Sequence, residues 1–162
     1  MSRKIRTCTQ EDIGVLVETM RRSFQDIAER FGLTQENAPN HPSNCTAEWI
    51  KKDMDRGVTY FIIENGDFVC GCVAIKRANP GVCYLERLAV LPDQRHQGFG
   101  ETLVNHVISK AKLLGVRNVN IGIIAEHTEL KIWYRGIGFV EGESKAYTHL
   151  PFRVTFMSYK VE

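Results

Sequence analysis

The sequence predicts an α/β protein built on one mixed sheet, with antiparallel strands first, a central parallel pair after them, and flanking helices. Its 162 residues, 43% apolar and 25% charged, have the length and composition of one folded unit, so we expect a single domain over 1–162. Three early strands joined by tight turns imply antiparallel pairing. A later succession of strand, helix and strand implies a parallel pair.

Each strand is predicted by a short run of β-branched and aromatic residues between turn signals. In chain order these runs are 3–7, 58–64, 68–76, 82–90, 116–125 and two more between 139 and 161, around the loop 144–151. Asn65-Gly66 is a strong hairpin signal and Asn79-Pro80-Gly81 a second turn, so three consecutive strands form an antiparallel run. Cys70 and Cys72 are two residues apart, and strand alternation predicts that they point to the same face.

Each helix is predicted by apolar side chains at about 3.6-residue spacing, followed by a glycine that ends the helix. The predicted helices are 13–31, 47–56, 99–114 and 128–135, and the glycines after them are Gly32, Gly57, Gly115 and Gly136. Thr9 with Asp12 forms a capping box before the first helix. Residues 33–46 are rich in Asn and Pro, which predicts a loop between the first two helices.

Composition excludes several classes of function. The 21 basic and 19 acidic residues leave a net charge of +2, too small to indicate a nucleic-acid or membrane partner. Apolar runs break within about eight residues where a membrane helix needs roughly 20, and no signal peptide opens the chain, so we expect a cytoplasmic protein. Five cysteines without a C-x-x-C pair favour reduced thiols and no metal. A site made by Cys70, Cys72 and a distant histidine stays open, without spacing to support it.

The segment Leu88–Gly100 carries the clearest chemical signal. A strand runs into a polar loop with two glycines, and a helix begins directly after them. The first N–H groups of a helix lack internal partners and carry partial positive charge, so this turn predicts an anion site to which Arg95 adds a mobile charge. The motif of nucleoside-triphosphate-binding loops is absent, and Gly98-Phe99-Gly100 lacks the third glycine of a dinucleotide fingerprint.

Arg95-His96-Gln97-Gly98-Phe99-Gly100, preceded by Val90-x-Pro92, resembles the Arg/Gln-x-x-Gly-x-Gly/Ala signature of the GNAT superfamily of N-acetyltransferases. Residues 127–139 resemble the second motif of that family, Asn-x-x-Ala-x-x-Leu-Tyr-x-x-x-Gly-Phe. One helix and one strand separate the two motifs, as in the family, and the element order also agrees. Departures from the pattern include His127, which replaces the usual Asn, and Leu130, which replaces the usual Ala.

The resemblance implies direct transfer of an acetyl group from acetyl-CoA, the co-substrate, to an amine. Acetyl-CoA would lie in a wedge where strands 82–90 and 116–125 splay apart. The residues expected to bind it are Leu88, Ala89, Val90, Arg95, His96, Gln97, Gly98, Phe99, Gly100, Glu101, His127 and Tyr134. The backbone N–H of Val90 would stabilise the oxyanion, a contribution of typically about 3–4 kcal/mol.

Tyr134 matches the family tyrosine that protonates the leaving thiolate, and a phenol with a pKa of about 10 can donate near neutrality. The alternative is that Tyr134 and Trp133 are ordinary core aromatics. A base must also take the proton of the amine, and Glu86 is our candidate. Strand alternation places Glu86 on the same face as Leu88.

Glu86 has an alternative interpretation as a surface charge paired with Arg87 or Lys76, and Tyr84 is a weaker candidate for proton relay. The acceptor site is implied at segments 24–49 and 144–152, where His41 and His149 are the candidate substrate-binding residues. Few acidic groups gather there, which disfavours a polycationic acceptor.

Three hypotheses therefore stand. The first is an N-acetyltransferase acting on a primary amine of a small molecule, a protein N-terminus or a lysine. The second is a catalytically weak CoA-binding sensor or regulatory module, and the third an interaction module that uses the fold as a scaffold. The resemblance also allows a homodimer.

Overall fold

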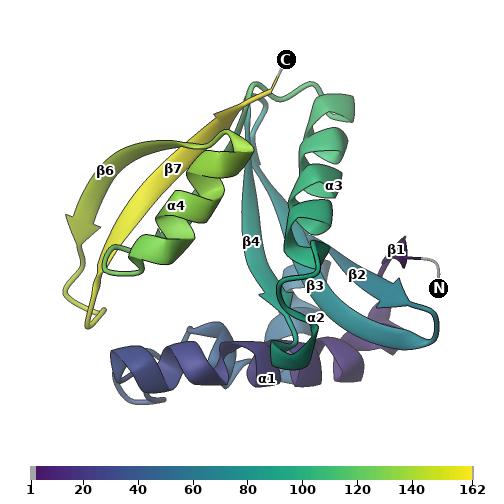
Figure 1. Cartoon of the computed structure of the whole chain (residues 1–162), viewed down its shortest axis with the longest axis horizontal. Coiled ribbons are helices and arrows are strands. Elements are labelled where there is room, and N and C mark those ends of the chain that lie inside the picture. Colours follow the sequence, from purple (N-terminus) through teal and green to yellow (C-terminus); the bar gives the residue numbers. More distant parts are fainter. Residues whose placement is uncertain (1–2, 162) are drawn as a thin grey trace.

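The computed structural model describes residues 3–161, which form a seven-stranded sheet in the order β1-β2-β3-β4-β5-β7-β6 (Figure 1). The strands are β1 (Arg3–Thr7), β2 (Thr59–Asn65), β3 (Phe68–Asn79), β4 (Val82–Val90), β5 (Asn118–Ile124), β6 (Val140–Ala146) and β7 (Arg153–Lys160). The helices are α1 (Ile13–Phe31), α2 (Ala47–Asp55), α3 (Phe99–Leu113) and α4 (Thr128–Ile137). The predicted element order and the mixed α/β sheet are confirmed.

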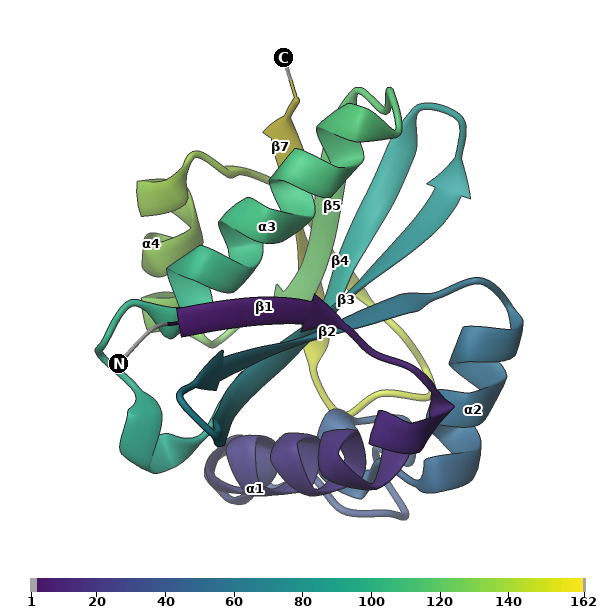
Figure 2. The ribbon, with the colours of Figure 1, turned by 90° about the vertical axis from the view of Figure 1, so that its right-hand side faces the viewer.

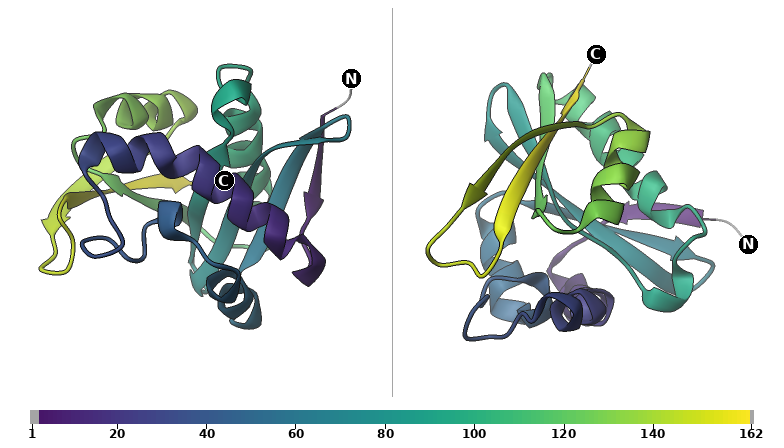
Figure 3. Two further views of the ribbon diagram at one scale, coloured as in Figure 1. Left: turned by 90° about the horizontal axis from the view of Figure 1, so that it is seen from below. Right: turned by 60° about the vertical axis from the view of Figure 1, so that its left-hand side comes forward.

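The helices cover both faces of the sheet. Helices α3 and α4 pack on one face, and α1 and α2 pack on the other, as the turned views in Figures 2 and 3 show. Each face has its own apolar core: one contains the buried residues of α3 together with Tyr134 of α4, and the other contains Leu16 and Met20 of α1 with Ile50 of α2. Two cores separated by one sheet account for the near-continuous burial of β3 through Cys70–Ile75.

Strands β4 and β5 are parallel neighbours but pair over a short distance only. Their register joins Val82–Tyr84 to Asn118–Asn120, and beyond these residues the two strands diverge. In Figure 1 the two halves of the sheet open downward from this pairing, and α1 lies across the open end. The divergence leaves Leu85–Val90 of β4 paired with β3 alone, so backbone groups on its other edge stay free of the ladder. The predicted splayed pair is therefore present.

A bulge in β4 corrects one prediction. Cys72 pairs with Ala89 and Ala74 pairs with Glu86, so two β4 residues, Arg87 and Leu88, lie opposite one residue of β3. Arg87 has a φ of 55°, the left-handed conformation that accommodates such an extra residue. The bulge reverses the alternation: Leu88 packs into the core beneath α3, whereas Glu86 lines a cavity beside α2. The expectation that Glu86 and Leu88 share a face is wrong.

A register shift in β3 corrects the prediction for the cysteines. Ile63 pairs with Gly71, yet Glu64 pairs with Val69, so Cys70 is an extra residue in the ladder. Cys70 therefore lies in the core under α3, and Cys72 lies in the opposite core. All five cysteines are free thiols. Within residues 3–161, His, Cys, Asp and Glu side chains form no group of three or more that could hold a metal ion.

Helix α4 extends beyond its predicted end. Gly136 lies inside the helix, which continues to Ile137 and ends at Gly138. Gly138 has a φ of 126°, and a Cβ there would lie 2.9 Å from the Tyr159 ring, so this glycine both ends the helix and admits the ring. In the part of the chain described here, no helix combines the length and hydropathy that a membrane span requires.

Candidate active site

The turn from β4 into α3 presents free backbone N–H groups. Gly98 precedes α3 with a φ of 85°, and His96 has a φ of 65°, so two left-handed residues bend the chain sharply before Phe99. The first backbone bond of the helix runs from the Thr102 N–H to the Gly98 carbonyl oxygen, 3.1 Å away. The preceding amides of residues 99–101 lie in the first turn of a 15-residue helix and lack intrahelical acceptors. This turn is therefore suited to bind an anion.

Arg95 is held in place, contrary to the mobile charge expected from the sequence. Its guanidinium forms an ion pair with Asp26 of α1 (Nη1 to Oδ2, 2.6 Å) and donates to the Ser23 carbonyl oxygen at 2.6 Å. Its Nε donates to the Val90 carbonyl oxygen at 3.2 Å. The guanidinium also holds the pKa of the Asp26 carboxyl below its usual range. Arg95 thus ties α1 to the end of β4, because an acid on α1 lies within its reach.

A second arginine, which the sequence did not single out, lies at the same turn. The Arg3 guanidinium carbon is 4.2 Å from the centre of the Phe99 ring, a cation–π arrangement. A Cβ built on Gly98 would be 3.4 Å from Arg3 Nη1. Because Arg3 comes from β1, 95 positions away in the chain, no local motif could have found it. It supplies positive charge beside the free amides of α3.

Tyr134 of α4 is buried in the core that also contains the buried residues of α3. Its ring packs edge-to-face against Trp133 and Phe139, with ring centres 4.9 Å and 5.2 Å away. Burial raises the pKa of the phenol well above its ordinary value, so the hydroxyl stays protonated across the neutral range. Among the described residues its hydroxyl has no hydrogen-bond partner. The phenol is thus able to donate a proton to a ligand in the core between the diverging strands.

Trp133 links the two motifs. A Cβ built on Gly100 would lie 3.2 Å from the Trp133 ring and 3.7 Å from Val90 Cγ2. The second glycine of the turn therefore lets the indole of α4 approach the start of α3. This contact brings β4, α3 and α4 together on one side of the site.

Glu86 lines a cavity of about 550 Å³ between α2 and the bulged part of β4. The other residues that line it are Asn40, Thr46, Glu48, Trp49, Lys52, Asp53, Arg56, Lys76 and Arg87. Over residues 3–161 Glu86 forms no ion pair; Arg87 pairs with Asp53 instead, at 3.4 Å. The alternative interpretation of Glu86 as a partner of Arg87 or Lys76 is therefore not what the structure shows.

The two histidines expected to bind substrate do not line this cavity. His41 caps the short 3-10 turn Pro42–Asn44: its Nδ1 accepts from the Ser43 N–H at 3.3 Å, and its ring packs edge-to-face on Phe24. Burial lowers the pKa of His41 to about 4. His149 is exposed beside Tyr147 in the loop between β6 and β7. The loop neighbour Asn40, not His41, faces the cavity.

His127, the residue in place of the family Asn, precedes α4 at the end of β5. Its ring lies 5.7 Å from the Phe31 ring of α1, and burial lowers the pKa of the imidazole. Beside it, Glu129 of α4 pairs with Arg30 of α1 (Oε2 to Nη1, 2.5 Å). Helix α1 is therefore bonded to both arms of the open sheet, to Arg95 on one side and to Glu129 on the other.

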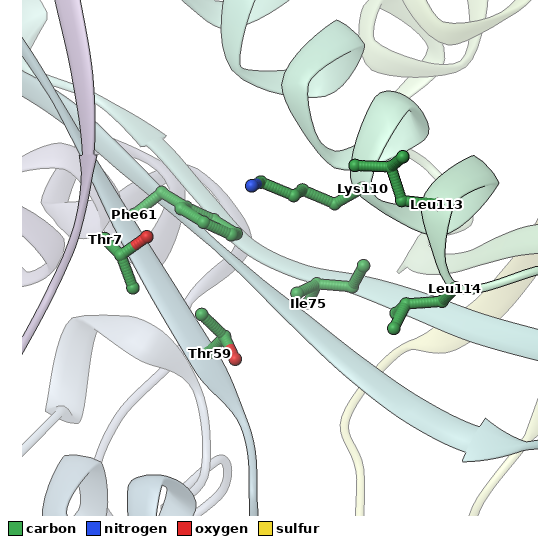
Figure 4. Close-up of a pocket in the computed structure, with 7 residues that line it drawn as sticks. All are labelled: Thr7, Thr59, Phe61, Ile75, Lys110, Leu113 and Leu114. Carbon is green, nitrogen blue, oxygen red and sulfur yellow. The ribbon is translucent and has the colours of Figure 1, made fainter.

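A smaller cavity of about 210 Å³ lies on the opposite face, between β1–β3 and the end of α3 (Figure 4). Thr7, Thr59, Phe61, Ile75, Leu113, Leu114 and Lys110 line it. Among the described residues, Lys110 is the only charged side chain that lines it, and none of the site residues predicted from the sequence contributes to it. The chemistry is concentrated instead around the divergence of β4 and β5.

The residues around this divergence fit an extended, phosphate-bearing acyl ligand. Free amides and Arg3 would meet an anion at one end, and the unpaired edge of β4 offers hydrogen-bonding groups beyond it. Asn120, the last residue of β5 that pairs with β4, has a buried side-chain oxygen without a hydrogen-bond partner among the described residues. An orphaned buried acceptor costs stability unless a ligand or water satisfies it.

This geometry is that of an α/β protein whose strand-to-helix turn is suited to a phosphate-bearing ligand. Residues 19–139 match the model of the Acetyltransferase (GNAT) family, and the chain belongs to that family. An amino-acid acetyltransferase from Azotobacter vinelandii is 26% identical over 138 residues, which are 84% of this chain and 27% of that protein. The chain thus spans about a quarter of the length of this curated relative.

Solved structures show the same fold. The ribosomal-protein-S18-alanine N-acetyltransferase of Escherichia coli superposes with a TM-score of 0.78 at 15% identity, over 99% of this chain and 95% of that one. The PaiA N-acetyltransferase of Thermoplasma acidophilum, solved in complex with coenzyme A, gives 0.77 at 18% identity over 99% of both chains. YncA of Salmonella typhimurium, solved with acetyl-CoA, gives 0.73 at 16% identity over 100% and 95%.

Proposed function

We propose that the chain is an N-acetyltransferase that transfers acetyl from acetyl-CoA directly to a primary amine. The observation that carries the proposal is the divergence of β4 from β5 beside the free amides of α3, with the Tyr134 phenol in the same core. Family membership and the structures solved with coenzyme A or acetyl-CoA support it. The acceptor amine belongs to a small molecule, a protein N-terminus or a lysine.

Each residue then has a defined part in the reaction. The amides of residues 97–101 and Arg3 hold the diphosphate, and backbone groups of Leu88–Val90 pair with the pantetheine arm. The Val90 N–H stabilises the developing oxyanion. Tyr134 protonates the departing thiolate, and Glu86 takes the proton from the amine directly or through water. His127 would contact the pantetheine arm in place of the family Asn.

Cellular setting and assembly belong to the same proposal. Five free cysteines, four of them buried, fit a reducing compartment, so we place the protein in the cytoplasm. The homodimer that the resemblance allowed stays a prediction, with size-exclusion chromatography coupled to light scattering as its test.

The test is release of free thiol from acetyl-CoA in the presence of a panel of amines, together with direct binding of acetyl-CoA. We expect binding and acceptor-dependent release. Gly98→Val should abolish binding, because a branched side chain is strained at a φ of 85° and obstructs the approach of a phosphate. Gly81→Val, in the turn before β4, is the matched control: Gly81 is not in the left-handed region, and a Cβ there would make an ordinary contact with Asn79 Oδ1 at 3.6 Å, so this variant should bind normally.

Two outcomes would contradict the proposal. Binding of acetyl-CoA without thiol release for any amine would favour the sensor hypothesis. A folded wild-type protein that neither binds nor reacts would leave only an interaction module.

A further inference from the structure

The cavity beside Glu86 is lined by charged side chains of both signs, with more cations than anions. It contains four cationic side chains, Lys52, Arg56, Lys76 and Arg87, and three anionic ones, Glu48, Asp53 and Glu86. Lys52 pairs with Glu48 at 3.2 Å on the surface of α2, and Arg87 pairs with Asp53. Among the described residues, Arg56, Lys76 and Glu86 form no ion pair. Two free cations and one free carboxylate complement a ligand that has an ammonium group and an acidic group.

Arg87 is held in this cavity by contacts with Trp49 and Asp53. Its guanidinium carbon lies 4.5 Å from the centre of the Trp49 ring, and its side chain is 17% exposed. Asp53, which holds one side of the guanidinium, also accepts from the Tyr60 hydroxyl at 2.5 Å. Arg87 is thus oriented from two sides, by a ring of α2 and by a buried, hydrogen-bonded carboxylate.

The guanidinium of Arg87 also has unused donors. Its Nε is buried and has no hydrogen-bond partner, a costly state for a charged group. Its backbone is in the left-handed region at a φ of 55°, an uncommon conformation for a residue with a Cβ. Strain of this kind is concentrated at functional sites, because the fold must hold it. A guanidinium is a planar group of N–H donors, and one with unused donors is suited to bind a carboxylate through two parallel hydrogen bonds.

The order of residues in β4 sets the size of the ligand. Glu86 and Arg87 are consecutive, so their Cα atoms are about 3.8 Å apart. Both side chains line the same cavity, because the bulge places Arg87 beside Glu86 on the α2 face. An amine that approaches Glu86 and a carboxylate that approaches Arg87 must therefore be close together in one small molecule.

We infer that the acceptor is a small amine with a carboxylate a few bonds away, an amino acid, and that Arg87 with Lys76 binds this carboxylate. The inference rests on the proposed function, since it names the acceptor class of that reaction. It excludes polyamines, whose charges would meet the free cations of the cavity.

The experiment compares each free amino acid with its primary amide as acceptor, in the thiol-release assay with saturating acetyl-CoA. The pair differs only in the carboxylate, and the pH is adjusted so that both amines are equally protonated. We expect kcat/KM for the best free amino acid to exceed that of its amide by about 10- to 100-fold, the range for losing a charge-assisted hydrogen bond. The difference should reside mainly in KM.

Arg87→Met should remove the discrimination, raising KM for the free acid and leaving the amide nearly unchanged. Because Asp53 is left buried without its cation in this variant, Lys76→Met is a second test. Lys76 is exposed and forms no ion pair within residues 3–161, so folding is preserved. It should weaken the discrimination several-fold. Arg77→Met is the matched control, since Arg77 donates to the carbonyl oxygens of Pro80 and Leu114 away from the cavity.

Four results would overturn the inference. Equal kcat/KM for acid and amide would do so, as would discrimination that survives both Arg87→Met and Lys76→Met. Preference for amines without any carboxylate would overturn the acceptor class but leave the proposed acetyltransferase intact. Absence of turnover with every acceptor would remove the proposed function itself, and this inference with it.

Discussion

The phenol of Tyr134 shows what a residue gains from its surroundings. Its position was identified from the second motif, but the motif says nothing of its pKa. The edge-to-face packing of Trp133 and Phe139 removes water from the ring, and the raised pKa keeps the proton available for a leaving thiolate. The motif predicts Tyr134 as the proton donor, and its burial explains why this proposed donor stays protonated.

Tyr134→Phe should lower kcat by about 10²-fold, the lower end for general acid catalysis, with little change in acetyl-CoA affinity. The ring contacts remain, so stability should be nearly unchanged. Thiol release and isothermal titration measure the two quantities. Tyr159→Phe is the matched control: Tyr159 packs on Phe139 from β7 and has no proposed part in transfer. Equal loss of turnover in both variants would remove the acid role of Tyr134.

Arg3 illustrates a site residue that sequence reasoning could not reach. It has no motif and lies on the first strand, yet it is brought to Gly98 by the pairing of β1 with β2 at the edge of the sheet. Arg95, by contrast, was identified from its motif but is bonded to α1. The sequence predicts where the free amides are, whereas the partner of each charge depends on the fold.

Arg3→Met should weaken acetyl-CoA binding several-fold at low ionic strength and less at high salt, because an exposed charge is screened. Titration at two salt concentrations measures this effect. Lys4→Met, one position further along β1, is the control and should bind as the wild type does. Unchanged affinity of Arg3→Met at low salt would place the diphosphate away from this turn.

At the scale of elements, the bulge in β4 explains why the site was only partly predictable. Strand bounds were predicted well: β1 and β4 match to the residue. The sheet face to which each side chain points was not predicted correctly, because the left-handed residue Arg87 reverses the alternation along β4. No glycine or proline in the sequence indicates this bulge. The same reversal places Glu86 and Arg87 in one cavity beside α2.

Helix α1 is a second element whose role comes from the fold. Its Asp26 forms an ion pair with Arg95 on one arm of the sheet, and its Arg30 forms one with Glu129 on the other. Arg95 lowers the pKa of the Asp26 carboxyl, and Arg30 lowers that of Glu129. Each ion pair therefore stabilises the fold above the unfolded carboxyl pKa of about 4, and this stabilisation is lost as the pH falls below it. These exposed pairs contribute little individually, and their main effect is on the position of α1.

Asp26→Asn should therefore cost less than about 1 kcal/mol of unfolding free energy. It should also strengthen acetyl-CoA binding several-fold, since Arg95 loses its competing carboxylate and becomes free to approach the diphosphate. Urea denaturation and calorimetric titration measure the two effects. Glu18→Gln, on the same helix and paired only with Arg22, is the control. Weaker binding in Asp26→Asn would mean that Arg95 acts by holding α1.

For the molecule as a whole, three half-buried histidines contribute to the response to acid. Burial lowers the pKa of His41 to about 4 and also lowers those of His106 and His127. Below about pH 6.5, the ordinary pKa of histidine, these imidazoles bind protons more readily in the unfolded chain than in the folded one. The free energy of unfolding therefore decreases as the pH is lowered. The histidine contribution should be lost between about pH 6.5 and 4, before the ion-paired carboxylates titrate.

Urea denaturation at pH 7.5 and pH 5 should show this loss, and His41→Gln should reduce the difference between the two pH values. His149→Gln, at an exposed position, should leave the difference unchanged. A pH difference of the same size in His41→Gln and wild type would mean that the cap of Pro42–Asn44 does not depend on a neutral imidazole.

The central claim concerns the open sheet: a diphosphate at the start of α3 directs an acyl group into the gap between β4 and β5. The most direct measurement is a crystal structure of the protein soaked with acetyl-CoA. The account predicts diphosphate density at the amides of residues 97–101 and the thioester beside Val90, with its sulfur facing the Tyr134 hydroxyl. Density for the diphosphate at any other place on the molecule would contradict it.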